Sequence, residues 1–493
     1  MAYFRLPFRD KTARFQIGTK YRVTTLTQSA QENKLEKNGL IEQNIRDKDL
    51  REVLSAKVDI IVVIPDNFRS YGVQEILPVL LKRIDRYRPQ HARVTLLVAG
   101  GINPPMKSEE LRSMLGNDIF NKYTVVTHNN DPRHTIFLGE TRSRLRIHLN
   151  QLLFYADCII TVDAIELDPF AGFTGGWQSI AMGCASKLTY EALLNAGLTK
   201  GAAPAGTDQF QRLLKRVVSP LNVQYAVQVF MNDSREIIDI NAGELPHTYQ
   251  QTAKKAQQLF SQEIAGSYDA AIVGIPHESS NYLVHVSQAL SNLVMTAGKV
   301  LKKGAPIISP AYLGHCPGGV FEHDFLSWME KGPDKIISAY EQNPGQFRGS
   351  ALYAVGFARI LQKHPVIIVA ASPGKDLKKW GLLHSRTMPD AFKIITKLNP
   401  KAKKLLFIPD LNHIIHSDNP PAANSNKTAP KRAGKEYCKS KPPPSRTTPK
   451  TTGKATKTKD VEKVSEQPPR ILRRHRRRVS KKAFGKTRNT RRE

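Results

Sequence analysis

The chain has 493 residues, of which 40% are hydrophobic, with 74 Lys and Arg against 43 Asp and Glu. At about 100–200 residues per domain, this length predicts two or three domains. The longest apolar runs, such as residues 58–65 and 364–372, have the length of strands. They fall far short of the roughly 18 apolar residues that a membrane-spanning helix needs, so we expect no membrane partner.

The cysteines and the N-terminal residues indicate the cellular compartment. Residues 1–20 contain no apolar core of a secretory signal. The four cysteines show neither CxxC nor CxH spacing, which argues against a disulfide framework and a structural zinc site. We therefore expect a reducing compartment and a cytoplasmic location. The cysteines are Cys158, Cys184, Cys316 and Cys438.

The excess positive charge is concentrated at the C-terminal end. Residues 417–493 carry 24 Lys and Arg against 6 Asp and Glu, with nine prolines and few large apolar side chains. Such a segment buries too little surface to offset the entropy of ordering it, so we predict a disordered tail. Its dense block Arg470–Arg478 could contact nucleic acid nonspecifically through counterion release. The alternative is a solvated appendage without a role, since no base-reading motif accompanies the charge.

Strands and helices alternate along the rest of the chain. Helical patterns cover residues 74–84, 108–115 and 281–303, with Ser108 as an expected N-cap and Gly304 as an expected C-terminal glycine. This alternation predicts an α/β fold with largely parallel sheets and helices on both faces. Apolar β-branched runs predict strands at residues 59–64, 94–99, 123–127, 158–162, 225–230, 270–275, 306–309, 366–371 and 404–408.

Residues 232–263 are turn-like and then helical, which separates two sets of strand–helix units. We therefore predict two α/β domains, at residues 1–265 and 266–416, with a cleft between them and the tail 417–493 behind them. Open α/β sheets bind ligands beyond the carboxyl ends of their strands. Functional motifs are thus expected just after the predicted strands.

Polar residues do follow three of these strands. Asp66 and Arg69 follow the first, where Arg69 could bind a phosphate or carboxylate in bidentate fashion, or merely pair with Asp66 in a turn. Asn103 follows the second, behind Gly100 and Gly101. His128 follows the third and is either a base or ligand, or a hydrogen-bonded loop residue.

The glycine-rich segment 165–179 follows the strand at residues 158–162. Its glycines and hydroxyl groups suggest a tight loop with donors aimed at an anion. No Lys follows Gly176, so the segment does not match the nucleotide-binding P-loop. Asp168 stands in this loop beside Pro169 and either accepts a proton or caps a turn.

Together these segments resemble the nickel-pincer lactate racemase family of 2-hydroxyacid racemases and epimerases over about residues 10–416. The resemblance implies a pyridinium mononucleotide that holds nickel, two histidines that act as acid and base, an anchoring lysine and a histidine that ligates nickel. The matching segments are residues 65–69, 99–106, 127–131, 166–179 and 281–304.

The chain departs from the family pattern at the positions that carry the chemistry. The two catalytic histidines correspond to Asn103 and Asp168, the anchoring lysine to Gln178 and the nickel ligand to Leu194. A helix lysine corresponds to Ser287 or Gln288. Asn103 has no titratable group, whereas Asp168 can accept a proton if burial raises its pKa. The family positions retained are Asp66, Arg69, Gly172, Gly175 and Gly176.

Three functions stay open at this point. The chain is a divergent racemase or epimerase of a 2-hydroxy acid or sugar acid, a non-catalytic homologue that binds a nucleotide-like or acidic small molecule, or a nucleic-acid-associated protein. We expect no protein ligand to a metal, and the pincer nucleotide could be held only non-covalently. The candidate catalytic residues are Asp168, Asn103 and His128, and the candidate cofactor-binding residues are Asp66, Arg69, Gly172, Gly175, Gly176 and Gln178.

Overall fold

The computed structural model describes residues 3–8, 11–28, 37–69, 72–200, 208–232, 236–275, 278–293, 298–317, 320–371 and 374–416. Residues 1–421 belong to one structural unit, which contains all of these ranges. The tail predicted for residues 417–493 lies outside the described residues. Among the helices in the described ranges, none has the length and hydropathy required to cross a bilayer.

The first six-stranded sheet has the order β13-β12-β9-β4-β5-β6. All its neighbours pair in parallel except β12 and β13. The sequence predicted every strand but β13, which lies in a stretch taken for a turn. The strands are β4 (Asp59–Pro65), β5 (Arg93–Ala99), β6 (Thr124–Thr127), β9 (Cys158–Ala164), β12 (Val223–Met231) and β13 (Ile237–Gly243).

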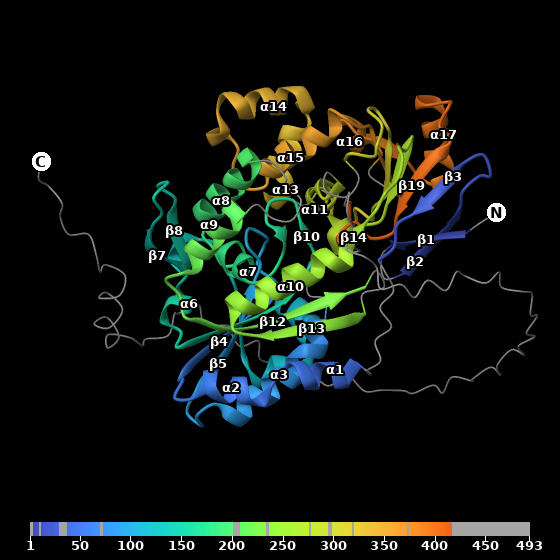
Figure 1. Ribbon diagram of the computed structural model, residues 1–493. Coiled ribbons are helices and arrows are strands. Elements are labelled where there is room, and N and C mark those ends of the chain that lie inside the picture. Colours follow the sequence, from blue (N-terminus) through green and yellow to red (C-terminus); the bar gives the residue numbers. More distant parts are fainter. Residues whose placement is uncertain are drawn as a thin grey trace, which may run out of the picture. The chain divides into compact units, whose positions relative to one another are not determined.

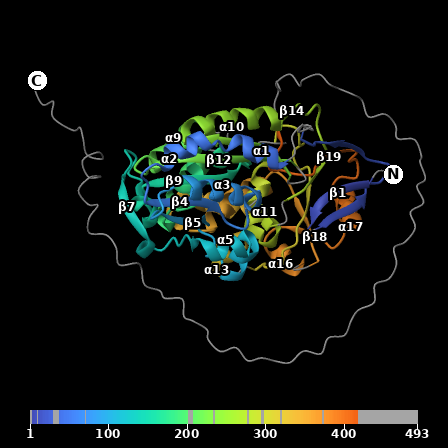
Figure 2. The same cartoon turned by 90° about the horizontal axis from the view of Figure 1, so that it is seen from below.

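Helices cover both faces of this sheet because its strands are apolar on both sides. In β4, Ile60 and Val62 pack in one core, whereas Ile61 and Val63 pack in another. Figure 2 shows α1, α2 and α3 lying across the strands on the first of these faces. The helices of this half are α1 (Lys37–Asn44), α2 (Asp47–Leu54), α3 (Val73–Tyr87), α4 (Ser108–Leu115), α5 (Asn117–Lys122), α6 (Gln151–Tyr155), α7 (Trp177–Ala181), α8 (Lys187–Lys200), α9 (Asp208–Val218) and α10 (Leu245–Phe260).

The second six-stranded sheet is parallel throughout, with the order β18-β17-β16-β15-β19-β3. Figure 1 shows β3 from the start of the chain beside β19 from its end. The predicted domain boundary at residue 265 stays a prediction. Strand β3 lies before that boundary in the chain and yet belongs to the second sheet. The strands are β3 (Arg22–Thr25), β15 (Ala270–Val273), β16 (Ile307–Pro310), β17 (Val366–Val369), β18 (Leu383–Ser385) and β19 (Lys404–Ile408).

One continuous core joins the two sheets, with side chains from both packed against the helices between them. The helices of the second half are α11 (Leu283–Ser291), α13 (Val320–Met329), α14 (Pro333–Gln342), α15 (Ala351–Leu361), α16 (Gly374–Lys379) and α17 (Met388–Leu398). Short strand pairs complete the fold: β1 (Tyr3–Phe8) with β2 (Lys11–Gln16), β7 (Thr135–Glu140) with β8 (Arg146–Asn150), β10 (Leu167–Asp168) with β11 (Gly172–Phe173), and β14 (Ser261–Gln262) with β20 (Ile415–His416).

The helix predicted over residues 281–303 is wrong in its length. Helix α11 ends at Ser291, and Asn292 turns its amide to the backbone carbonyl of Leu167, 3.2 Å away. Leu301 forms a β-bridge with Tyr268. The described residues of this stretch are therefore not one continuous helix, because Asn292 and Leu301 bond to other parts of the fold.

The predicted N-cap of α4 is also shifted by one residue. Lys107 is the N-cap, and its backbone N–H donates to the carboxylate of Glu110 at 2.7 Å. Ser108 is the first residue of the helix itself.

Candidate functional site

The strand orders of the two sheets bring four loops to one cavity. In each sheet, the strand order reverses direction beside a central strand, because the strands that follow it in the chain lie on both of its sides. Open α/β sheets bind ligands at such a switch point. In the first sheet it lies between β4 and β9, and in the second between β15 and β19. The loops after these strands line one cavity of about 160 Å³, which is room for a small molecule. Their lining residues include Asp66, Arg69, Glu166, Asp168, Ser279 and Asn412.

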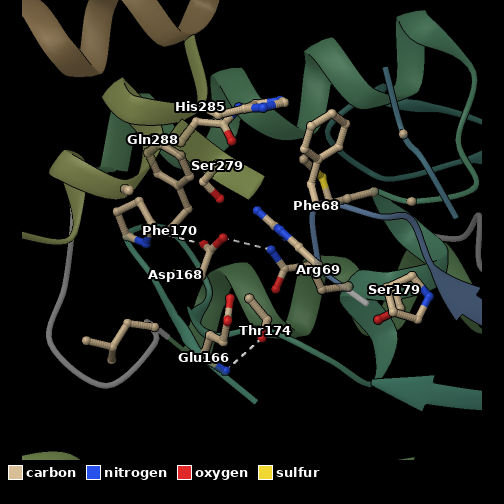
Figure 3. Close-up of a pocket in the computed structure, with 18 of the residues that line it drawn as sticks. Phe68, Arg69, Glu166, Asp168, Phe170, Thr174, Ser179, Ser279, His285 and Gln288 are labelled. Carbon is tan, nitrogen blue, oxygen red and sulfur yellow. Dashed lines mark hydrogen bonds between the residues drawn. The ribbon is translucent and has the colours of Figure 1, made fainter. Parts of the chain in front are cut away.

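Arg69 extends into this cavity with much of its side chain exposed there. Figure 3 shows its guanidinium reaching toward Asp168 and Ser279. The guanidinium makes no hydrogen bond to any residue in the described ranges, so its donors are available to a ligand. Burial lowers the pKa of Arg69, but the charges of Asp168 and Glu166 outweigh it and raise the pKa overall. Arg69 is therefore a permanent cation.

Asp66, Asn103 and His285 form a chain of hydrogen bonds along the cavity wall. Asn103 Nδ2 donates to Asp66 Oδ2 at 2.7 Å, and the Nε2–H of His285 donates to Asn103 Oδ1 at 3.3 Å. Burial raises the pKa of Asp66 to about 6, although Asn103 and Arg69 oppose it. Burial and Arg69 lower the pKa of His285 to about 3, so its imidazole is neutral at physiological pH.

Asp168 faces the cavity and also caps a turn. Its Oδ1 accepts backbone N–H bonds from Phe170 at 2.9 Å and Ala171 at 2.7 Å. Its Oδ2 accepts from Gln178 Nε2 at 2.9 Å. Gln178 Oε1 is buried and has no hydrogen-bond partner among the described residues. The turn cap that the sequence suggested for Asp168 is therefore present, and its role as a proton acceptor stays a prediction.

Asp163 supports the glycine loop from below. It lies at the end of β9, and its Oδ2 accepts from the backbone N–H of Gly176 at 3.0 Å, while its Oδ1 accepts from the hydroxyl of Ser179. Burial raises its pKa to about 6, against the pull of these two bonds. A fourth carboxylate thus borders the cavity, beside Asp66, Glu166 and Asp168.

The three glycines of the loop serve its own packing. All have positive φ, at 78° for Gly172, 90° for Gly175 and 60° for Gly176. A Cβ atom would lie 2.6 Å from Gln228 Nε2 at Gly175 and 2.8 Å from the Tyr249 ring at Gly176. Only Gly175 of the three lines the cavity. Their predicted contact with a ligand stays a prediction.

His128 lies apart from these residues, at a second hollow. Its Nε2 bonds to the backbone carbonyl of Ala185 at 2.9 Å and its Nδ1 to the side-chain amide of Asn150 at 3.0 Å. Burial lowers its pKa to about 4. Both ring nitrogens are thus occupied in holding neighbouring loops, which is the alternative that the sequence left open.

Sequence reasoning missed several cavity residues that other elements supply. His285 comes from α11 and Tyr353 from α15, far along the chain from the glycine loop, and Tyr190 comes from α8. Gln288 lines the cavity, whereas the Ser287 hydroxyl donates to Val284 O inside its own helix at 2.6 Å. The signal that could have found His285 is its place on the helix that follows β15, the central strand of a sheet.

The fold and this site define a class: two doubly wound α/β sheets whose switch points share one polar cavity. The comparisons with known proteins are specific. Residues 8–200 match the family described as Lactate racemase N-terminal domain. The lactate racemase of Lactiplantibacillus plantarum is 27% identical over 426 residues, which cover 83% of this chain and 98% of that protein. The lactate racemase of Thermoanaerobacterium thermosaccharolyticum is 26% identical over 389 residues, which cover 75% and 87%.

Solved structures agree with this fold. The lactate racemase apoprotein from T. thermosaccharolyticum superposes with a TM-score of 0.73 at 21% identity, over 85% of this chain and all of that one. A protein from Thermotoga maritima superposes with a TM-score of 0.59 at 16% identity, over 76% and 99%. Residues 8–200 therefore match this family model, and most of the chain is similar to lactate racemases in sequence and in fold.

Proposed function

We propose that this lactate-racemase-like protein binds a 2-hydroxy acid or a sugar acid in the shared cavity and does not interconvert the enantiomers of lactate. The observation that carries the proposal is Arg69, a cation exposed to the cavity whose donors meet no acceptor in the described part of the chain. A carboxylate supplies two acceptor oxygens in the geometry that a guanidinium prefers.

The remaining lining residues favour a ligand with hydroxyl groups. Four carboxylates border the cavity against one guanidinium. An ionised carboxylate only accepts hydrogen bonds, so a ligand must bring donors as well as a negative group. A 2-hydroxy acid brings one hydroxyl, and a sugar acid brings several. The carboxylates concerned are Asp66, Asp163, Glu166 and Asp168.

The nickel-pincer group of the family does not fit the residues present here. Gln178 has an amide in place of a reactive amine, and that amide donates to Asp168. Leu194 lines the cavity with hydrocarbon and cannot ligate nickel. Within the described ranges, no three His, Cys, Asp or Glu side chains form a group able to hold a metal ion. We therefore derive no step through this group.

The second candidate is a divergent racemase or epimerase of the same substrate class. Asp66 favours it, because a carboxyl with a pKa of about 6 can gain and lose a proton near neutral pH. Asn103, the residue matched to a catalytic histidine of the family, donates a hydrogen bond to this carboxyl. In this second candidate, Asp66 is the group that accepts and returns the proton of the substrate.

Calorimetric titration with D-lactate, L-lactate and D-gluconate tests the binding proposal. We expect binding of at least one acid, and a loss of more than tenfold in affinity in Arg69→Met. Arg69→Lys is the matched control, which keeps the charge and loses the bidentate fork. Unchanged affinity in Arg69→Met would exclude Arg69 as the carboxylate site.

Protein purified from its own host separates the two candidates. Mass spectrometry and metal analysis determine whether a pincer nucleotide and nickel accompany it, and chiral chromatography follows D- and L-lactate. We expect neither the group nor interconversion. Turnover in both directions would establish the racemase and show that the assignment of Asn103 and Leu194 to the family positions is wrong.

A further inference from the structure

Two tyrosines from opposite halves of the protein meet inside the cavity. Tyr190 belongs to α8 behind the first sheet, and Tyr353 belongs to α15 behind the second. Their hydroxyl groups are hydrogen-bonded to each other, and both rings line the cavity that holds Arg69. Neither residue belongs to a motif that led to the family.

The hydrogen-bond capacity of this pair is not used up. Each phenol carries one hydrogen, and their mutual bond uses one of the two. Among the residues that the structure describes, neither hydroxyl has a second acceptor. One O–H donor is therefore left for a ligand, in the cavity where Arg69 also has unused donors.

Tyr353 is the more exposed member of the pair. Tyr190 is 7% exposed and its ring lies under Gly101, where a Cβ atom would be 3.2 Å from the ring, whereas Tyr353 is half-buried. Tyr353 is also among the groups whose charge would act on Arg69. Either hydroxyl can donate in the mutual bond, and when Tyr190 donates, the hydrogen of Tyr353 is left for the cavity.

Both phenols stay protonated and able to donate at physiological pH. Burial raises the pKa of Tyr190 and of Tyr353, and Arg69 only partly offsets this. A neutral phenol beside a guanidinium adds a hydrogen bond to an anion without adding charge. The combination suits a carboxylate, which has more acceptor sites than one guanidinium fills.

We propose that Tyr353, held by Tyr190, is a ligand-binding residue that donates its hydroxyl hydrogen to the carboxylate on Arg69. This inference rests on the proposed function. It narrows that function to a ligand whose carboxylate accepts two hydrogen bonds from Arg69, in the first half of the protein, and one from Tyr353, in the second half. A hydrogen bond to a charged group makes a difference of roughly tenfold or more in affinity.

Tyr353→Phe and Tyr190→Phe test the assignment, because each keeps the ring and removes one hydroxyl. Calorimetry with L-lactate and with propionate, which lacks the hydroxyl, should show at least a tenfold loss in Tyr353→Phe for both acids. Tyr190→Phe should lose less than threefold, since Tyr353 can still donate. Circular dichroism and melting temperature establish that each variant is folded.

The outcomes separate this inference from the function beneath it. If the unmodified protein binds none of D-lactate, L-lactate, D-gluconate and propionate, the proposed function fails and this inference fails with it. If both acids bind and Tyr353→Phe binds them equally well, only the inference fails. A loss for lactate alone would assign the phenol to the hydroxyl of the ligand and overturn the carboxylate assignment.

Discussion

The charges of Asp168 and Arg69 together set the affinity of the cavity for a carboxylic acid. The motif resemblance assigns Asp168 to the position of a base, yet its two oxygens already accept three hydrogen bonds. Its negative charge also offsets the positive charge of Arg69. As a counterion, Asp168 weakens the attraction of Arg69 for a carboxylate, whereas a base at this position would strengthen binding through the hydroxyl.

Asp168→Asn distinguishes these roles. We expect the affinity for lactate to rise roughly fivefold, because one negative charge beside Arg69 is removed. The melting temperature should stay within a few degrees, since Gln178 can rotate its amide and offer its unpaired Oε1 to the new Nδ2. Calorimetry and thermal melting measure both. A fall in affinity in a stable variant would restore Asp168 as a contact of the hydroxyl.

Asp66 predicts a pH dependence of stability. Burial raises its pKa to about 6, from 3.8 in the unfolded chain. Between about pH 4 and pH 6 the folded protein keeps a proton that the unfolded chain releases, so this stabilisation is present below about pH 4 and is lost as the pH rises through 6. In Asp66→Asn this dependence disappears.

Urea unfolding of wild type and Asp66→Asn at pH 4 and pH 8 measures this effect. We expect the stability of the variant relative to wild type to improve by on the order of 2 kcal/mol at the higher pH. Hydrogen bonds lost by the substitution affect both pH values and cancel in the comparison. A constant difference would mean that water reaches the carboxyl and that its pKa is ordinary.

At the scale of elements, the glycine loop between β11 and α7 depends on backbone conformation. Gly176 has φ of 60°, and a Cβ atom there would approach Tyr249 to 2.8 Å. We expect Gly176→Ala to lower the free energy of unfolding by at least about 1 kcal/mol more than Gly381→Ala. Gly381 has a similar φ of 74° and open space around it, so it isolates the backbone cost. Equal losses in denaturant melts would show that Tyr249 gives way.

The elements that the sequence predicted well are those whose local pattern and burial agree. Strands such as β4 and β9 are continuous apolar runs, which a buried parallel sheet requires. The antiparallel β13 was missed because Asp239 and Asn241 interrupt its apolar residues and the strand follows a turn-like stretch. The end of α11 was missed because Asn292 donates a hydrogen bond to Leu167 and Leu301 forms a β-bridge with Tyr268, and both partners are distant in the sequence.

The candidate site divides in the same way. Asp66, Arg69 and the glycine loop follow strands and could be found from sequence. Tyr190 and Tyr353 could not, because helical tyrosines at a cavity look like core residues until the two sheets are placed together. His285 could have been found only from its place on the helix that follows β15.

At the scale of the whole chain, the C-terminal residues are expected to be separable from the unit at residues 1–421. Deletion of residues 422–493 keeps β20 and should change the melting temperature by less than about 2 °C, because that segment has few apolar residues to lose. Scanning calorimetry measures the change. The same deletion should abolish retention on DNA-cellulose at low salt, and retention by the shortened chain would locate the basic surface within residues 1–421.

The position of β3 beside β19 affects when the second sheet can form during translation. Arg22 in β3 pairs with Lys404 in β19, so a strand near the start of the chain waits for one translated about 380 residues later. At about 5–20 residues per second, that delay is roughly 20–80 s. Throughout it, Phe4 and Phe15 lack Phe407, the ring against which they later pack. The second sheet therefore cannot be completed until nearly all of residues 1–416 have been synthesised.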